Sequence, residues 1–119
     1  MTGKLLGLVV ALAMFAPAAT WAQTIVDGQT LKARCATIQL ANPSGGLACR
    51  GYVGAIADVL AEGNPIGEFR ACPPAGATRE ALVKVVKSWL ERHPDLLKSK
   101  AHILCARALA EEFPCPSGE

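Results

Sequence analysis

The sequence contains few aromatic residues, few histidines and little excess charge of either sign. Its 119 residues include three Phe, two Trp, one Tyr and two His, and 12 basic residues oppose 10 acidic ones. Such a balanced charge provides no basic surface for nucleic acid, so no nucleic-acid partner is expected. No stretch alternates between polar and apolar residues for long enough to form a strand. The composition therefore favours a small all-α protein.

Residues 1–22 have the order of features typical of a secretory signal peptide. A basic residue, Lys4, precedes an apolar block over Leu5–Phe15, and Pro17 ends this block. Thr20 and Ala22 are placed as the minus-three and minus-one residues of a cleavage site. A membrane anchor is the alternative, but the apolar block is shorter than the roughly 20 residues that a spanning helix needs. We expect cleavage after Ala22, a periplasmic product with no membrane segment, and a mature domain over residues 23–119.

Helical periodicity dominates residues 23–119, which are enough for one small domain. We expect helices over 29–41 and 47–62, a third that begins after Thr78 and stops at His93-Pro94, and a fourth that begins between Leu96 and Ala101. The polar turn 42–46 makes the first two helices antiparallel, and Gly63 can cap the second. The sequence thus predicts a four-helix domain made of two helical hairpins.

The segment 49–58 stands out because Gly51 and Gly54 interrupt a stretch that otherwise reads as helix, with Tyr52 on its apolar face and Asp58 at its end. A glycine inside a helix costs about 1 kcal/mol relative to alanine. Both glycines therefore suggest a place where another backbone comes close.

Five cysteines lie in the part expected to be exported, where oxidation is favoured. Cys35 and Cys49 fall near facing positions of the first hairpin, and Cys72 and Cys115 fall at the same end of the second. We therefore expect the pairs Cys35–Cys49 and Cys72–Cys115, although sequence alone does not fix connectivity. Cys105 remains, and its place in an apolar stripe favours a buried, inert thiol over a reactive or intermolecular one.

The residues that could carry catalysis do not form a recognisable set. A cysteine nucleophile needs a histidine in reach, and His93 has the position of a helix cap while His102 lies on a face with charged neighbours. Asp58 and Glu62 are one helical turn apart, which is more often a solvated face than an acid/base pair. We expect no enzyme activity, no cofactor and no metal site.

Taken together, the order and spacing of these residues resemble the Rap/Tai family of immunity proteins. The resemblance covers nearly all of the chain from Cys35 onward, and the residues that carry it are Cys49, Gly51, Tyr52, Val53, Gly54, Asp58, Cys72-Pro73-Pro74, Thr78, Val85-Val86, Trp89-Leu90, His93-Pro94, Ala101, Ala108-Leu109 and Phe113-Pro114-Cys115. Trp89 stands where the family usually has tyrosine, Glu80 stands where glutamine is common, and Cys105 is additional to the usual four half-cystines.

Characterised members of that family bind and neutralise peptidoglycan amidase effectors delivered by type VI secretion systems, often as dimers. The resemblance therefore implies a periplasmic immunity protein that occludes the active-site cleft of a secreted amidase, with a homodimer as a possible state. A periplasmic helical adaptor or acid-stress chaperone with the same disulfide-bonded architecture remains the alternative.

The shared positions specify a scaffold, so the partner must be recognised elsewhere. Two connections are candidates, 62–70 and 94–100, and the second is favoured because a protruding loop suits a cleft. The candidate partner-binding residues are Glu68, Arg70, Asp95, Leu96, Leu97 and Lys98. Leu96 or Leu97 could equally well begin the core face of the fourth helix.

Overall fold

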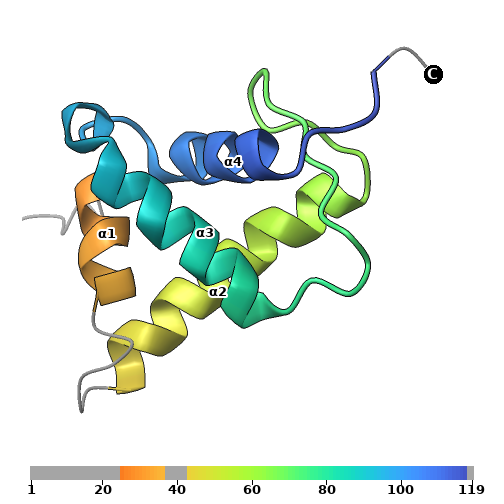
Figure 1. Cartoon of the computed structure of the whole chain (residues 1–119). Helices are drawn as coiled ribbons and strands as arrows, with labels where there is room; N and C mark the ends of the chain where they lie inside the picture. The colour runs from red at the N-terminus through yellow and green to blue at the C-terminus, as the bar shows by residue number, and fades with distance from the viewer. Residues whose placement is uncertain (1–24, 37–42, 118–119) are drawn as a thin grey trace, which may run out of the picture.

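Four α-helices and one short 3-10 helix form the fold, in a computed structural model that describes residues 25–36 and 43–117. The elements are α1 (Gly28–Ala36), α2 (Pro43–Ala61), α3 (Arg79–Arg92), η2 (Pro94–Leu96) and α4 (Ala101–Glu112). Every pair of the four α-helices is in contact (Figure 1). The all-α, four-helix prediction is confirmed.

The ends of α3 follow the local signals in the sequence. The Thr78 hydroxyl accepts a hydrogen bond from the Ala81 amide (3.1 Å), which caps the start of the helix. Arg92 is its last residue, and His93 leaves the helical conformation directly before Pro94. After α2, Gly63 adopts a positive φ of 87°, and its amide donates to the Leu60 carbonyl (3.0 Å). Both expected stops are therefore confirmed.

The start of α2 differs from expectation. Residues 42–46 were expected to form a turn, but α2 already begins at Pro43 and continues through Ser44-Gly45-Gly46. Proline suits the first helical position because it has no amide hydrogen to leave unpaired and its φ is preset. At the other side of the connection, α1 begins at Gly28 and is described as far as Ala36. The expected helical positions 37–41, Ile38 among them, lie outside the described residues.

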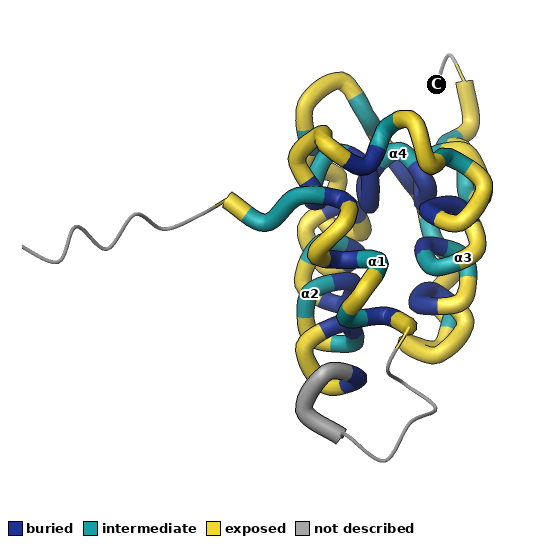
Figure 2. The backbone as a smooth tube through the Cα atoms, turned by 90° about the vertical axis from the view of Figure 1, so that its left-hand side faces the viewer, coloured by how far each residue is buried: buried dark blue, intermediate teal, exposed yellow. Residues whose placement is uncertain are grey.

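The core fills the space between the helices, and the residues that face inward are buried on each (Figure 2). Its largest fully buried side chains are those of Trp89, Leu31, Leu90, Leu109, Val53 and Val86. Ile56 and Val85 are partly buried at its edge. Within the described residues the core contains no buried polar or charged residue.

The glycines of α2 do not mark a close backbone. Gly51 is exposed, and a Cβ at this position would have nothing within 4 Å. Gly54 is buried, but what faces it is a side chain, because a Cβ there would lie 2.8 Å from Arg79 Nε. Tyr52 beside them is half-buried and Asp58 is exposed. The expected contact with another backbone is therefore wrong at both glycines.

Two disulfides join the elements as expected. Cys35–Cys49 links α1 to α2 with a Cα–Cα distance of 5.0 Å, and Cys72–Cys115 links the segment before α3 to the segment after α4 with 4.9 Å. Cys105 is free and fully buried. Burial raises the pKa of its thiol to about 12, so the nucleophilic thiolate is scarcely present at neutral pH. The expectation that Cys105 is free and buried is confirmed, and that it is inert stays a prediction.

Candidate partner-binding surface

The turn between α3 and α4 is well ordered by its own hydrogen bonds. After Pro94 the chain makes one 3-10 turn, in which the Leu96 amide donates to the His93 carbonyl (3.1 Å) and the Ser99 amide donates to the Leu96 carbonyl (3.0 Å). Asp95 and Lys98 are exposed and Leu96 is partly buried. Leu97 is only 6% exposed and belongs to the core. Leu97 therefore anchors the turn, and its side chain cannot serve as the partner contact that was expected.

The N-terminal segment supports this turn from the inner side. The Gly28 amide donates to the Ser99 carbonyl (2.9 Å), the Gln29 amide to the Leu97 carbonyl (3.0 Å) and the Ala101 amide to the Val26 carbonyl (2.8 Å). A Cβ at Gly28 would lie 2.9 Å from both the Cα and the carbonyl oxygen of Leu97. The close backbone approach in this fold is therefore at Gly28.

Asp27 holds the same region by capping α1. Its carboxylate accepts a hydrogen bond from the Thr30 amide (2.8 Å), and this bond lowers the pKa of Asp27. The sequence interpretation missed Asp27 and Gly28, although an Asp immediately before a helix is a typical N-cap. Gly28 carried no local signal, because its neighbours come from residues 97–104.

The second candidate segment forms a tight turn between α2 and α3. Ile66 and Phe69 exchange backbone hydrogen bonds of 3.0 and 3.1 Å, and Gly67 between them takes a positive φ of 59°. Glu68 and Arg70 are exposed on this turn. A Cβ on Gly67 would lie 3.1 Å from Cδ1 of Ile103, so the turn rests on the first turn of α4.

The first turn of α4 links the two candidate segments. Ile103 follows the 94–100 turn in the chain, its amide donates to the Lys100 carbonyl (3.1 Å), and its side chain faces Gly67 of the 66–69 turn. Figure 1 shows both turns in the upper part of the view, the 94–100 turn before the start of α4 and the loop that follows α2 above α4. We call residues 66–70, residues 94–100 and Ile103 the two-turn surface. Its exposed residues include two carboxylates and three cations, and its partly buried residues include Ile66, Leu96 and Ile103 (the charged residues are Glu68, Asp95, Arg70, Lys98 and Lys100).

A cluster of aromatic and charged side chains fixes the base of the 94–100 turn. The rings of Trp89 and His93 stack at 3.9 Å, and His93 Nδ1 donates to the Trp89 carbonyl (2.7 Å), which confirms its capping role. Trp89 Nε1 donates to Glu111 (2.7 Å), and Arg107 donates to the same carboxylate (3.1 Å) from a position over the Trp89 ring. The hydrogen bond from Trp89 is the main cause that lowers the pKa of Glu111, and the hydrogen bond and charge of Arg107 lower it further. The cluster joins α3 to α4 and fixes where the turn begins.

The described residues show no arrangement typical of a catalytic or metal centre. They contain no group of three or more His, Cys, Asp and Glu side chains that could hold a metal ion. His102 is half-buried on α4, while Asp58 and Glu62 are exposed near the end of α2. Cys105 lies in the core with a raised pKa.

The fold and this surface define a small, disulfide-bonded, all-α binding domain. None of the helices in the described part of the chain is long and apolar enough to cross a membrane. The chain matches the family model of the Rap1a immunity proteins over residues 27–115, and it belongs to this family. No curated protein and no solved structure matches it. Membership indicates a role in effector immunity through the binding of a partner effector, and the two disulfides together with the family point to an exported protein.

Proposed function

We propose that the chain is an immunity protein that binds a secreted peptidoglycan amidase effector of a type VI secretion system in the periplasm. Residues 1–22 serve as its signal peptide, and it acts by occluding the amidase cleft, without catalysis of its own. The family match over residues 27–115 carries this proposal. The resemblance to the Rap/Tai proteins supplies the effector class and the periplasmic setting.

We further propose that the two-turn surface makes the contact with the amidase. Both of its turns are braced, 94–100 by the hydrogen bonds from the N-terminal segment and 66–69 by its own bonds and by Ile103. A surface that is ordered before binding loses little conformational entropy on association. Asp95, Lys98 and Glu68 are its exposed contacts, and Leu96 is a partly buried apolar one.

The test is capture of the producer's own secreted effectors by the mature, oxidised protein, followed by an amidase assay on the captured protein. Stoichiometric capture with loss of amidase activity supports the proposal. Lys98→Glu should weaken capture by about tenfold or more, because a reversed charge at an interface costs more than a lost one. Lys84→Glu, an equally exposed lysine of α3 outside the surface, is the matched control.

Other outcomes would contradict the proposal in different ways. Many weak clients whose binding changes with pH would favour the adaptor or chaperone alternative. Capture that is unchanged in Lys98→Glu and Asp95→Lys would place the contact elsewhere on the domain. Light scattering of the free protein tests whether it forms the homodimer that the family resemblance implies as a possible state.

A further inference from the structure

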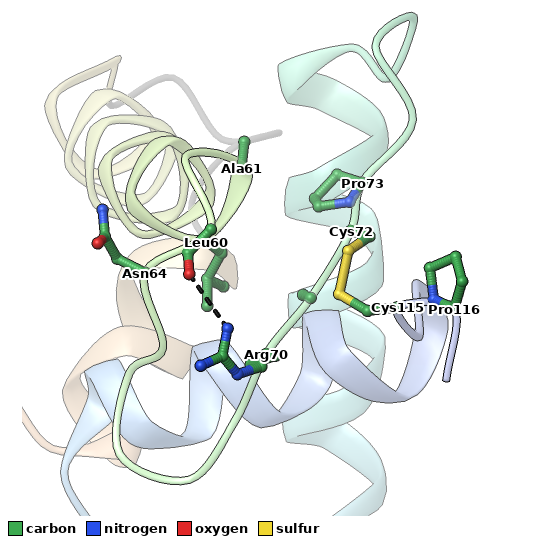
Figure 3. Close-up of a pocket in the computed structure, with 10 residues that line it drawn as sticks. Leu60, Ala61, Asn64, Arg70, Cys72, Pro73, Cys115 and Pro116 are labelled. Atoms are coloured by element: carbon green, nitrogen blue, oxygen red, sulfur yellow. Dashed lines mark hydrogen bonds between the residues drawn. A yellow bond between two sulfur atoms is a disulfide. The ribbon is translucent and has the colours of Figure 1, made fainter. Parts of the chain in front are cut away.

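A pocket of about 550 Å³ opens beside the two-turn surface. It lies between the end of α2, the segment 70–73 and the segment that follows α4 (Figure 3). This volume is within the range of about 300–1,000 Å³ that is usual for ligand sites. The pocket shares Arg70 with the two-turn surface, and the family match assigns no role to the pocket itself.

The inner wall of the pocket is apolar and rigid. Leu60 and Ala71 are each 2% exposed, and the Cys72–Cys115 disulfide joins the two segments beside them. The Cys72 amide also donates to the Phe113 carbonyl (2.8 Å), which holds these segments together. Pro73 and Pro116 complete the wall. The disulfide and the backbone hydrogen bond therefore hold the pocket's wall in place, and this wall offers an apolar contact.

One cation stands at the opening. Arg70 is the single charged residue among those that line the pocket, and the lining includes no carboxylate. Its Nη1 donates to the Gly63 carbonyl at 3.3 Å, and within the described part of the chain the guanidinium has no acidic partner. Figure 3 shows the Arg70 guanidinium reaching toward the end of α2, with the disulfide to one side of it and the Asn64 side chain pointing away on the other. A planar guanidinium with unused N–H groups is suited to a carboxylate, which it can bind through two parallel hydrogen bonds.

We propose that this pocket receives an acidic side chain of the bound effector together with an apolar side chain next to it. The inference rests on the proposed function, because the side chains that would occupy the pocket belong to the effector. The carboxylate pairs with Arg70, and the apolar neighbour packs on the accessible part of the lining, which Pro73, Pro116 and the Cys72–Cys115 disulfide supply. A small inorganic anion would use only the guanidinium and leave the apolar wall uncovered. A carboxylate on an apolar segment matches both halves of the pocket.

The first experiment is independent of the effector and uses two peptide probes, acetyl-Leu-Glu-amide and acetyl-Leu-Gln-amide. Each is titrated into the mature, isotopically labelled protein at roughly millimolar concentrations, and NMR shifts are followed. The Glu peptide should shift the amide signals of Ala71 and Cys72 and the Arg70 Nε–H signal, and it should bind about tenfold more tightly than the Gln peptide. Arg70→Gln should abolish that preference, whereas Lys84→Gln should keep it. Equal binding of both peptides, or no shift at the pocket, would overturn the proposal.

The second experiment uses the amidase that the wild-type protein captures. Arg70→Gln should weaken its binding by about 30-fold, since truncating one member of a hydrogen-bonded charge pair at an interface has effects of this size or larger. Lys84→Gln should stay within about threefold of the wild type, as expected of a charge outside the interface. Circular dichroism of both variants verifies that they fold.

The two experiments separate the two proposals. If the wild type captures an amidase and Arg70→Gln binds it equally well, the pocket inference is wrong and the proposed function stands. If the peptides behave as expected but no amidase is captured, the proposed function is wrong. In that case the occupant of the pocket does not come from an amidase effector. The preference of the pocket for carboxylates would still hold.

Discussion

Replacing Gly28 by alanine should destabilise the domain, because this glycine is where two distant parts of the chain meet. A Cβ at this position would lie 2.5 Å from Leu104 Cδ1, and 2.9 Å from the Cα and the carbonyl oxygen of Leu97. The Leu104 methyl can rotate away, but the Leu97 backbone cannot move without disturbing the hydrogen bonds from Gly28 and Gln29. Overpacking of this kind costs about 1–3 kcal/mol. In a domain of this size 2 kcal/mol corresponds to a fall of roughly 10 °C in the melting temperature.

The matched control is Gly51→Ala. Gly51 also lies in a helix, but a Cβ there would have nothing within 4 Å. Alanine is favoured over glycine inside a helix by about 1 kcal/mol, so this variant should be more stable than the wild type. Urea unfolding of the two variants, with intact disulfides, measures both changes. Changes of the same sign, or a neutral Gly28→Ala, would refute the account of the contact between the N-terminal segment and the 94–100 turn.

Three further predictions concern the cysteines and the cluster at the base of the turn. Replacing Cys72 and Cys115 together by alanine should lower the free energy of unfolding by up to about 4 kcal/mol in urea titrations, because the bond closes a long loop; a loss below 1 kcal/mol would contradict this. Cys105 should not react with a thiol reagent at pH 8 in the native protein and should react fully after unfolding in urea, since burial raises its pKa to about 12. Glu111→Gln should cost about 0.5 kcal/mol at pH 7, a small value because the carboxylate is half exposed to solvent. The pKa of Glu111 in the native protein is lowered from 4.5, so the carboxylate stabilises the fold above pH 4.5 and this stabilisation is lost as the pH falls through the native pKa. If the free energies of unfolding of the variant and the wild type differ equally at pH 3 and pH 7 in urea titrations, this account of Glu111 is wrong.

The parts of the fold that the sequence predicted well are those with local signals. The start of α3 follows from Thr78 and its end from His93-Pro94, and each of these signals acts within one turn of helix. The disulfide pairs followed from the expected hairpins, because a short connection constrains which positions can face each other. Asp27 offered a similar local signal as a helix cap, and it could have been recognised.

The parts that failed depend on contacts between distant residues. A glycine in a helical stretch does not reveal what faces it, so Gly51 and Gly54 were interpreted as close approaches while Gly28 was overlooked. Leu97 follows a helix stop in a polar turn, and only its packing shows that it belongs to the core. Two further features depend on the tertiary arrangement alone. They are the contact of the 66–69 turn with Ile103 and the pocket beside Arg70, and no local sequence pattern predicts either of them.

The attachment of the N-terminal segment to the 94–100 turn has a consequence for the order in which the domain can assemble. α1 has nine residues, too few for a stable helix on its own. Its first residues are held by backbone hydrogen bonds to Leu97 and Ser99, and the segment before it by a bond from Ala101. The first residues of the domain are therefore coupled to a segment about 70 residues later in the chain, and a fragment that ends before residue 97 lacks all three of these hydrogen bonds. Such contacts between distant residues form late and slow folding, because the long intervening loop must close before they can be made.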